Sequence, residues 1–468
     1  MSTRAWPQPA AHGESEQSPD SARRRSDLQA ANTTLPSAEA LRLQGRAHAL
    51  IPGGAHTYAK GDDQFPVCAP PFIARGSGSH VWDVDGREYI EYGMGLRAVT
   101  LGHAFDPILS AVRRQLADGT NFTRPAPIEV QLAERFLQVV PAEMVKFCKD
   151  GSDAVDGALR LARAHTARGR VAVCTDHPFF STSDWFIGTT GMPAGVPQAT
   201  RELTLQFRYN DLGSLQALFA DYPGQIACVI MEPARVEEPA PGYLENLKEL
   251  VHAKGALLVF DEMITGFRWH LKGAQHVYGI APDLSAFGKA LANGFSVSAL
   301  AGRREFMQLG GFEHDRERVF LLSTTHGAET HQLAAALATL DFYEANPVVE
   351  TLYARGERLR SGFVQAAAAR GVSRYVELVS RECNLLFVTK DADERPNQLF
   401  RTLFMQEMIK RGVLAPSLVV SYSHSEDDID RTIDAIDATL VTYRKALDDG
   451  PERYLDGRPV KPAVRRFV

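Results

Sequence analysis

The sequence of 468 residues has no apolar run near the roughly 20 residues that a membrane-spanning helix needs. Its first residues also lack the apolar core of a secretory signal peptide. The formal net charge is only −6, which predicts no general affinity for polyanions. We therefore expect a cytoplasmic protein that binds neither membranes nor nucleic acids.

Cysteine is scarce and scattered. The five cysteines lie far apart in apolar surroundings, and none forms the CxxC pair typical of metal sites: Cys68, Cys148, Cys174, Cys228 and Cys383. An odd number with this spacing is typical of reduced, buried thiols in a cytosolic protein. We expect no disulfide framework and no metal centre.

The composition otherwise predicts a globular protein, with 44% hydrophobic and 23% charged residues. The exception is the stretch 1–35, which is rich in Ser, Pro, Gln, Ala and Arg and has no apolar periodicity. Such a segment buries too little apolar surface to offset the entropy of ordering, so we predict disorder there. A helix is expected to begin after Ser37, which is a suitable N-cap.

Strands alternate with helices between residues 127 and 300. A hairpin with an Asp85-Gly86 turn comes earlier, at 81–90. This alternation predicts an α/β fold with a large, mostly parallel sheet, whereas the region after 330 predicts a smaller α+β domain. The expected divisions are a segment at 36–80 that joins the small domain, a large domain at 81–335 and the small domain at 336–468. The predicted elements are helices 127–139, 153–167, 212–220, 244–254, 331–345, 348–370, 397–411 and 426–447, and strands 143–148, 170–174, 203–206, 226–231 and 256–261.

Ligands in such sheets bind beyond the carboxyl ends of the strands. Polar candidates follow these strand ends: Gly151 and Ser152, His177, Glu232, Asp261 and Lys289. Lys289 lies in Phe-Gly-Lys-Ala-Leu, where burial would lower its pKa and make it a nucleophile for Schiff-base chemistry. Taken alone, it is better interpreted as an exposed lysine at a turn.

Two further features support the cofactor interpretation of Lys289. Asp261 ends an apolar strand, and a buried carboxylate there needs a partner such as a protonated pyridine nitrogen, unless it caps the next segment. Gly151 and Ser152 open a helix, where backbone N–H groups bind phosphate, although an ordinary N-cap has the same composition. The three features together are more specific than any one of them.

The order of these features resembles the class III pyridoxal-phosphate aminotransferases of fold type I, in the branch of glutamate-1-semialdehyde aminomutase. The resemblance covers residues 37–447. It is carried by Asp-Gly-Ser-Asp-Ala-Val at 150–155, Val-Phe-Asp-Glu-Met at 259–263, Phe-Gly-Lys-Ala-Leu-Ala-Asn-Gly at 287–294 and Ser-Thr-Thr-His-Gly at 323–327. The loop at 53–66 and the stretch at 184–190 are also similar to the sugar aminotransferases of aminoglycoside antibiotic biosynthesis.

The resemblance implies roles for individual residues. Lys289 would carry pyridoxal 5'-phosphate, Asp261 would pair with its pyridine nitrogen, and Gly151 and Ser152 would bind its phosphate. Glu232 would lie near the cofactor hydroxyl and Met263 against one ring face. Thr324 matches a threonine that reaches the phosphate from the neighbouring subunit, which implies a homodimer with shared sites.

The sequence departs from the family at three places. Where an aromatic residue stacks on the ring, His177, Phe179 and Phe180 compete, and we favour Phe179. The stretch 413–422 lacks the arginine with which the ornithine and γ-aminobutyrate branches hold a carboxylate. The loop after Pro-Gly-Gly at 52–54 also lacks the arginine of the aminomutase, and offers His56, Tyr58 and Asp62 instead.

These replacements, together with Glu238, suit a hydroxylated cationic substrate, although the acids are equally compatible with a solvated surface. We interpret the protein as an aminotransferase that moves an amino group, from glutamate or a similar donor, to an oxidised amino sugar. The same proton abstraction would serve an aminomutase or an epimerase. A cofactor-binding protein without catalytic activity is the remaining alternative, and the joint presence of Lys289 and Asp261 counts against it.

Overall fold

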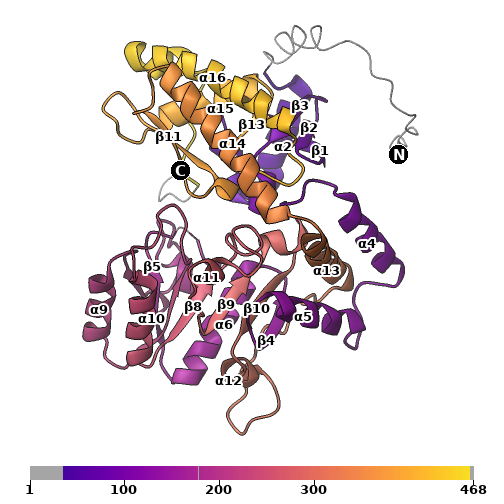
Figure 1. The fold of residues 1–468 in the computed structure, drawn as a ribbon, viewed down its shortest axis with the longest axis vertical. Coiled ribbons are helices and arrows are strands. Elements are labelled where there is room, and N and C mark those ends of the chain that lie inside the picture. The colour runs from indigo at the N-terminus through magenta and orange to yellow at the C-terminus, as the bar shows by residue number, and fades with distance from the viewer. Residues whose placement is uncertain (1–34, 178, 464–468) are drawn as a thin grey trace.

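The computed structural model describes residues 35–177 and 179–463, which form two domains (Figure 1). The disorder predicted for 1–35 lies almost entirely outside the described residues. One domain is built on a seven-stranded sheet, and the other contains the N-terminal hairpin and the C-terminal helices. No helix among the described residues is long and apolar enough to cross a membrane.

The large sheet has the strand order β4-β10-β9-β8-β7-β5-β6. The five strands from β9 to β6 run parallel, whereas β10 is antiparallel to both of its neighbours. This confirms the predicted α/β fold with a mostly parallel sheet. The bounds are β4 (Met144–Cys148), β5 (Arg170–Cys174), β6 (Thr204–Phe207), β7 (Ile226–Met231), β8 (Leu257–Asp261), β9 (Leu284–Phe287) and β10 (Ser298–Gly302).

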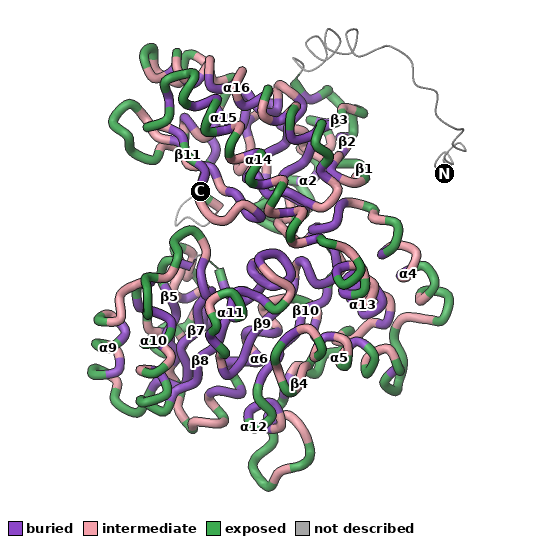
Figure 2. The backbone as a smooth tube through the Cα atoms, in the orientation of Figure 1, coloured by how far each residue is buried: buried purple, intermediate pink, exposed green. Residues whose placement is uncertain are grey.

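Helices cover both faces of this sheet, which is why its central strands are buried at every position and almost entirely apolar. In β8, Leu257 and Val259 pack into a core with α6 (Gly151–Thr166), while Leu258 and Phe260 pack into a core with α9 (Leu212–Asp221) and α10 (Tyr243–Ala253). Successive side chains of a strand point to opposite faces, so a strand buried on both sides has no polar alternation. The continuous burial of these strands is visible in Figure 2.

Four further helices pack near β4 and β10 or connect the two domains. They are α4 (Asp106–Ala117), α5 (Pro127–Val139), α13 (Thr330–Ala345) and the short α3 (Met94–Arg97). Helix α13 lies against α4 and α5. Short elements complete the large domain: α7 (Asp184–Ile187), α8 (Gln198–Arg201), α11 (Ala274–Val277), η4 (Lys289–Ala292), α12 (Arg304–Met307) and η5 (Gln308–Gly310).

The predicted hairpin belongs to a sheet of the other domain. Strands β1 (Ile73–Ser77), β2 (His80–Asp83) and β3 (Glu88–Glu91) pair antiparallel, with Gly86 at φ +82° in the turn, and β3 pairs in parallel with β13 (Val413–Leu414). The expected start of the large domain at residue 81 therefore differs from the observed pairing. Pairing between β3 and β13 spans more than 300 residues and leaves no local signal in the sequence.

The rest of the small domain packs around one apolar core. The C-terminal helices and strands supply most of that core. Helix α2 begins at its predicted cap, because Ser37 Oγ accepts a hydrogen bond of 3.1 Å from the Ala40 N–H. The bounds are α2 (Ala38–Leu50), α14 (Val348–Ala369), β11 (Val376–Val379), η6 (Glu382–Asn384), β12 (Leu386–Thr389), α15 (Gln398–Lys410), α16 (Glu426–Asp449) and η7 (Pro451–Tyr454).

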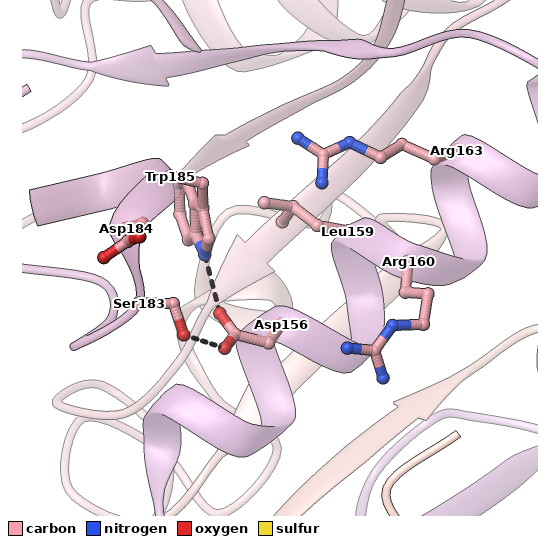
Figure 3. Close-up of a pocket in the computed structure, with 7 residues that line it drawn as sticks. All are labelled: Asp156, Leu159, Arg160, Arg163, Ser183, Asp184 and Trp185. Atoms are coloured by element: carbon pink, nitrogen blue, oxygen red, sulfur yellow. Dashed lines mark hydrogen bonds between the residues drawn. The ribbon is translucent and has the colours of Figure 1, made fainter. Parts of the chain in front are cut away.

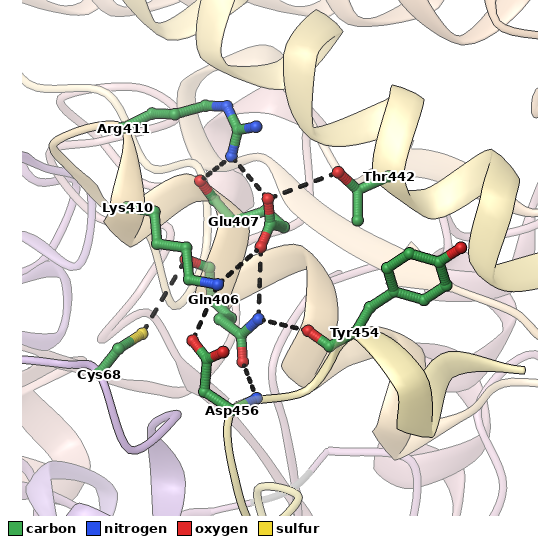
Figure 4. Close-up of polar contacts among 8 residues, drawn as sticks. All are labelled: Cys68, Gln406, Glu407, Lys410, Arg411, Thr442, Tyr454 and Asp456. Carbon is green, nitrogen blue, oxygen red and sulfur yellow. Dashed lines mark hydrogen bonds and ion pairs between the residues drawn. The ribbon is translucent and has the colours of Figure 1, made fainter. Parts of the chain in front are cut away.

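The segment after α16 is held on α15 by a polar network (Figure 4). The Gln406 amide donates 2.8 Å to the Tyr454 carbonyl and accepts 2.8 Å from the Asp456 N–H. Lys410 pairs with Asp456 at 2.8 Å. A buried amide that satisfies backbone groups fixes the path of an otherwise irregular segment.

Most predicted elements are confirmed to within one or two residues. Helix 127–139 and strands 170–174 and 226–231 agree at both ends. Strand β10 was missed because Ser-Ala-Leu-Ala-Gly has little β-propensity, and its central position in the sheet stabilises it instead. All five cysteines are buried and free, as expected.

Candidate active site

Lys289 follows β9 directly, at the carboxyl end of the large sheet. Its backbone has φ +45°, a left-handed conformation that non-glycine residues rarely adopt. The residues on either side, Gly288 and Ala290, are buried, whereas Lys289 is partly exposed. Strain of this kind persists where the surrounding packing enforces it, and it is concentrated at functional sites.

The charge state of Lys289 is set by its surroundings. Burial lowers the pKa of its ammonium group, while the carboxylates of Asp261 and Glu232 act in the opposite direction. Burial prevails, so more of the amine is neutral near pH 7 than for an exposed lysine. A neutral amine is the form that attacks a carbonyl carbon.

Asp261 ends β8, one strand away from β9. Its Cα lies opposite Ala286 in the sheet, and only 3% of the residue is exposed. One oxygen accepts a hydrogen bond of 2.9 Å from the Met263 N–H. Burial, and then the neighbouring Glu232, raise the pKa of this carboxyl to about 7. Within the described chain Asp261 forms no ion pair, so its carboxylate is available to a cationic nitrogen.

Glu232 follows β7 on the next strand and is also buried. Its Oε2 atom has no hydrogen-bond partner among the described residues. Burial raises the pKa of this carboxyl, while Arg235, Lys289 and Arg97 oppose the shift. A buried oxygen left unpaired is costly, so this atom suits a hydroxyl donor on a ligand.

His177 packs beside Glu232. Its Nδ1 accepts a hydrogen bond of 3.0 Å from the Glu232 N–H, which assigns the ring proton to Nε2. Burial, and then Arg235, lower the pKa of this imidazole to about 3. His177 is therefore a neutral group at physiological pH.

Helix α6 begins at Gly151, as the predicted phosphate cradle requires. Asp150 caps it by accepting 3.0 Å from the Asp153 N–H. Ser152 Oγ accepts 3.0 Å from the N–H of Thr182, whose hydroxyl lies 3.3 Å away. Two hydroxyls thus lie at the positive end of the helix dipole. Thr182 was missed because nothing in the sequence links it to residue 152.

The loop that carries Thr182 is anchored by Asp156 (Figure 3). Its carboxylate accepts hydrogen bonds from Ser181 at 2.8 Å, from the Trp185 indole at 2.6 Å and from Ser183. The hollow beside it has a volume of about 260 Å³ and includes Arg160 and Arg163. It does not contain Lys289 or Asp261, so its contribution to the site is to hold residues 181–185 in place.

Met263 occupies the space between two glycines. A Cβ on Gly151 would lie 2.9 Å from Met263 Sδ, and a Cβ on Gly288 would lie 2.6 Å from the same atom. Both separations are shorter than real side chains allow. The glycines therefore let Met263 pack closely between α6 and the Lys289 turn, in the area where the sequence places a cofactor ring.

The three ring-stacking candidates are separated by the structure. Phe180 is buried against Phe186, and His177 is turned toward Glu232. Phe179 is 49% exposed and touches Phe186 edge-on. Its stacking role stays a prediction.

The expected substrate residues lie in less buried positions. His56 and Tyr58 are exposed, in a loop of short 3-10 turns that comprises η1 (Pro52–Gly54), η2 (Tyr58–Lys60) and η3 (Asp62–Gln64). Asp62 contacts Gln44 at 3.1 Å and Arg458 at 3.4 Å. Glu238 pairs with Arg381 at 2.8 Å and accepts 2.7 Å from the Tyr278 hydroxyl. Both acids thus have protein partners, and among the described residues neither forms a hydrogen bond or ion pair with Lys289.

Thr324 is exposed, in a turn closed by a 3.3 Å bond from the Gly327 N–H to its carbonyl. Within the described chain, no side-chain hydrogen bond links Thr324 to Ser152 or Lys289. Two residues that the sequence did not single out do act on Lys289 electrostatically, namely Arg97 and Arg235. Arg97 lies in the glycine-rich segment 93–103, and Arg235 follows Glu232 by three residues.

Comparison with known proteins agrees with this arrangement. The family described as aminotransferase class-III matches residues 57–440. A glutamate-1-semialdehyde 2,1-aminomutase of Desulforamulus reducens is 34% identical over 83% of this chain and 94% of its own. The FumI protein of Sphingopyxis sp. MTA144, solved with PLP, is similar with a TM-score of 0.81 and 29% identity, over 90% of this chain and all of its own. An ω-transaminase of Sphaerobacter thermophilus has a TM-score of 0.76 and 27% identity, over 86% and 97% of the two chains.

Proposed function

This chain belongs to the class-III aminotransferase family of pyridoxal-phosphate-dependent enzymes, and from that premise we propose that it transfers an amino group from an acidic amino donor to a carbonyl carbon of an amino sugar. The observation that supports the proposal most directly is that Lys289 and Asp261 lie at the ends of adjacent strands, where the charge of each shifts the pKa of the other. A lysine and a carboxylate in this relation serve both steps of a transamination.

The residues present fit pyridoxal phosphate. The unpaired Oε2 of Glu232 suits its ring hydroxyl, Asp261 suits its pyridine nitrogen, and Ser152 at the start of α6 suits its phosphate. When bound, the cofactor supplies an electron sink for the charge that develops on the substrate carbon.

The residues of this chain have separate roles in the reaction. Nζ of Lys289 holds the cofactor covalently and, once released, moves the proton of the carbon that bears the amino group. Its lowered pKa favours the neutral amine that accepts this proton. Asp261 is shielded from water and has a raised pKa, so a ring cation beside it would stabilise its charged form, and His177 stays neutral beside Glu232.

Production of a keto acid tests the transfer. Purified holoenzyme is incubated with glutamate and, in separate reactions, with a panel of oxidised aminoglycosides as acceptors. We expect 2-oxoglutarate in amounts that match the newly aminated sugar. Absence of keto acid from every amino donor contradicts the proposal.

The second candidate is an aminomutase, which the 34% identical relative of that name favours. An aminomutase moves the amino group within one substrate and releases no keto acid. Incubation with glutamate-1-semialdehyde separates the two candidates, because conversion to 5-aminolevulinate without 2-oxoglutarate supports the aminomutase alone.

We further propose a cytoplasmic homodimer with shared sites. The exposed turn at Thr324 and the exposed rings of Phe312 and Phe320, at 84% and 68%, support an interface on this side. Light scattering during size-exclusion chromatography is expected to give twice the chain mass. An active monomer contradicts this part of the proposal.

A further inference from the structure

Two arginines act on the charge of Lys289 and on the buried carboxylate of Glu232. Arg97, at the end of α3, and Arg235, three residues after Glu232, are both partly exposed. In the described part of the chain, neither guanidinium forms an ion pair with an acid, and the Nη1 and Nη2 atoms of Arg97 make no hydrogen bond. Arginines that are not fully exposed normally have such partners.

The side chain of Arg97 is held by the small domain, and its backbone is held by Arg268 of the large domain. Its Nε donates 2.9 Å to the side-chain carbonyl of Asn384, which is fully buried. Its own carbonyl accepts 3.1 Å from the buried Arg268, which also donates to the carbonyls of Cys383 and Val420. These contacts fix one edge of the Arg97 guanidinium and leave its two terminal nitrogens for a ligand.

Arg235 is fixed from the same side. Its carbonyl accepts 2.7 Å from the Ser380 hydroxyl, a few residues before Asn384. The segment 380–384 therefore contacts both arginines, through the side chain of Arg97 and the backbone of Arg235. A guanidinium with two free donors binds a carboxylate through two parallel hydrogen bonds, a geometry that lysine does not offer.

The charges in this area do not balance. Burial, and then the proximity of Arg235 and Arg268, lower the pKa of Arg97 to about 10. Arg97 and Arg235 also act against the protonated form of Lys289. Among the described residues, the acids that oppose these cations at Lys289 are Asp261 and Glu232, which the cofactor would engage. An anionic ligand would relieve this repulsion.

We propose that Arg97 and Arg235 bind a carboxylate group of the amino substrate beside Lys289. The pair takes the place of the arginines that are missing from the loop at 55–65 and from 413–422. The ligand class is a small amino acid with a free carboxylate, such as an acidic amino donor. This inference rests on the proposed function, because it assigns a substrate to the same site.

Glutarate tests the proposal directly, since it carries carboxylates but has no amino group to react. Binding to the holoenzyme is measured by calorimetry for the wild type, Arg97→Gln, Arg235→Gln and the corresponding Arg→Lys variants. Arg358→Gln is the matched control, because Arg358 pairs with Asp430 on the surface, and its loss changes the net charge equally. The cofactor absorption of each variant verifies that the site is intact.

We expect each Gln variant to raise the dissociation constant of glutarate by about 10- to 100-fold, the range for a charged hydrogen bond. The Lys variants should recover part of the loss, and Arg358→Gln should bind like the wild type. In kinetics with glutamate, the Gln variants should raise KM more than they lower kcat, because the lost contact holds the substrate before and during reaction.

Glutarate binding that stays within twofold of the wild type in both Gln variants overturns the proposal, as does a wild-type holoenzyme that does not bind glutarate. Failure of the proposed function gives a different result. In that case no amino donor yields a keto acid, while glutarate binding still depends on Arg97 and Arg235.

Discussion

The imidazole Nδ1 of His177 accepts a hydrogen bond of 3.0 Å from the backbone N–H of Glu232. The two residues follow neighbouring strands, β5 and β7, so the bond joins two strand ends at the site. It also prevents protonation of Nδ1 without loss of the contact. A neutral histidine is thus part of the folded site.

His177 is expected to make the protein sensitive to acid. Burial lowers its folded pKa to about 3, below the ordinary value of 6.5. Stability from a group with a depressed pKa is complete above 6.5 and is lost as the pH falls toward 3, by at most about 1.4 kcal/mol per pH unit.

Urea unfolding at pH 8 and pH 5 measures this loss. The wild type should lose about 2 kcal/mol more than His177→Asn over this interval. His56→Asn serves as the control, since His56 is exposed and should follow the wild type. An equal loss in His177→Asn and the wild type would contradict the assignment.

Asp261→Asn is expected to reduce turnover while preserving shape. The amide keeps the volume and the acceptor for the Met263 N–H, but it removes the negative charge that a ring cation needs. Loss of one preorganised electrostatic contact costs kcat about 100-fold or more. Steady-state kinetics with saturating cofactor provides the measurement, and a kcat within twofold of the wild type would count against the role of Asp261.

Gly151→Ala should weaken cofactor binding through Met263. The new Cβ would lie 2.9 Å from Met263 Sδ, and the next two contacts are also atoms of that side chain. Met263→Ala removes all three, so the double variant should bind the cofactor like Met263→Ala alone. The coupling energy expected from a double-mutant cycle is about 0.5–3 kcal/mol.

Spectrophotometric titration of the apoenzyme with pyridoxal phosphate provides the four dissociation constants. Gly45→Ala is the control, because its Cβ would meet nothing within 4 Å and the position is helical. Strict additivity of the Gly151 and Met263 effects would refute the packing relationship.

Much of the fold and the chemical centre follow from local sequence. Helices such as 127–139 are set by apolar periodicity, and strand β8 is set by its continuous apolar run with Asp261 at the end. Lys289, Asp261 and Glu232 were found because parallel strands bring their carboxyl ends to one edge of a sheet. The order of the motifs along the chain therefore predicts the type of site.

The parts that were missed depend on contacts between distant segments. Thr182 reaches Ser152 only because Asp156 anchors its loop. Arg97 is positioned by Asn384, which lies 287 residues away. For Glu238, a distant contact makes the sequence-based prediction less secure. Its negative charge suggested a contact with substrate, whereas in the fold it pairs with Arg381. Hydrogen bonds between residues so far apart in the chain produce no periodicity or spacing in the sequence.

The central claim is that Nζ of Lys289 binds the cofactor covalently. Purified protein is loaded with pyridoxal phosphate, reduced with borohydride and digested, and the peptides are analysed by mass spectrometry, with Lys289→Ala treated in parallel. The account predicts one reduced pyridoxyl phosphate group, on the peptide that contains Lys289, and no modified peptide in Lys289→Ala. A modified peptide elsewhere, or a wild-type protein that takes up no cofactor, would contradict it.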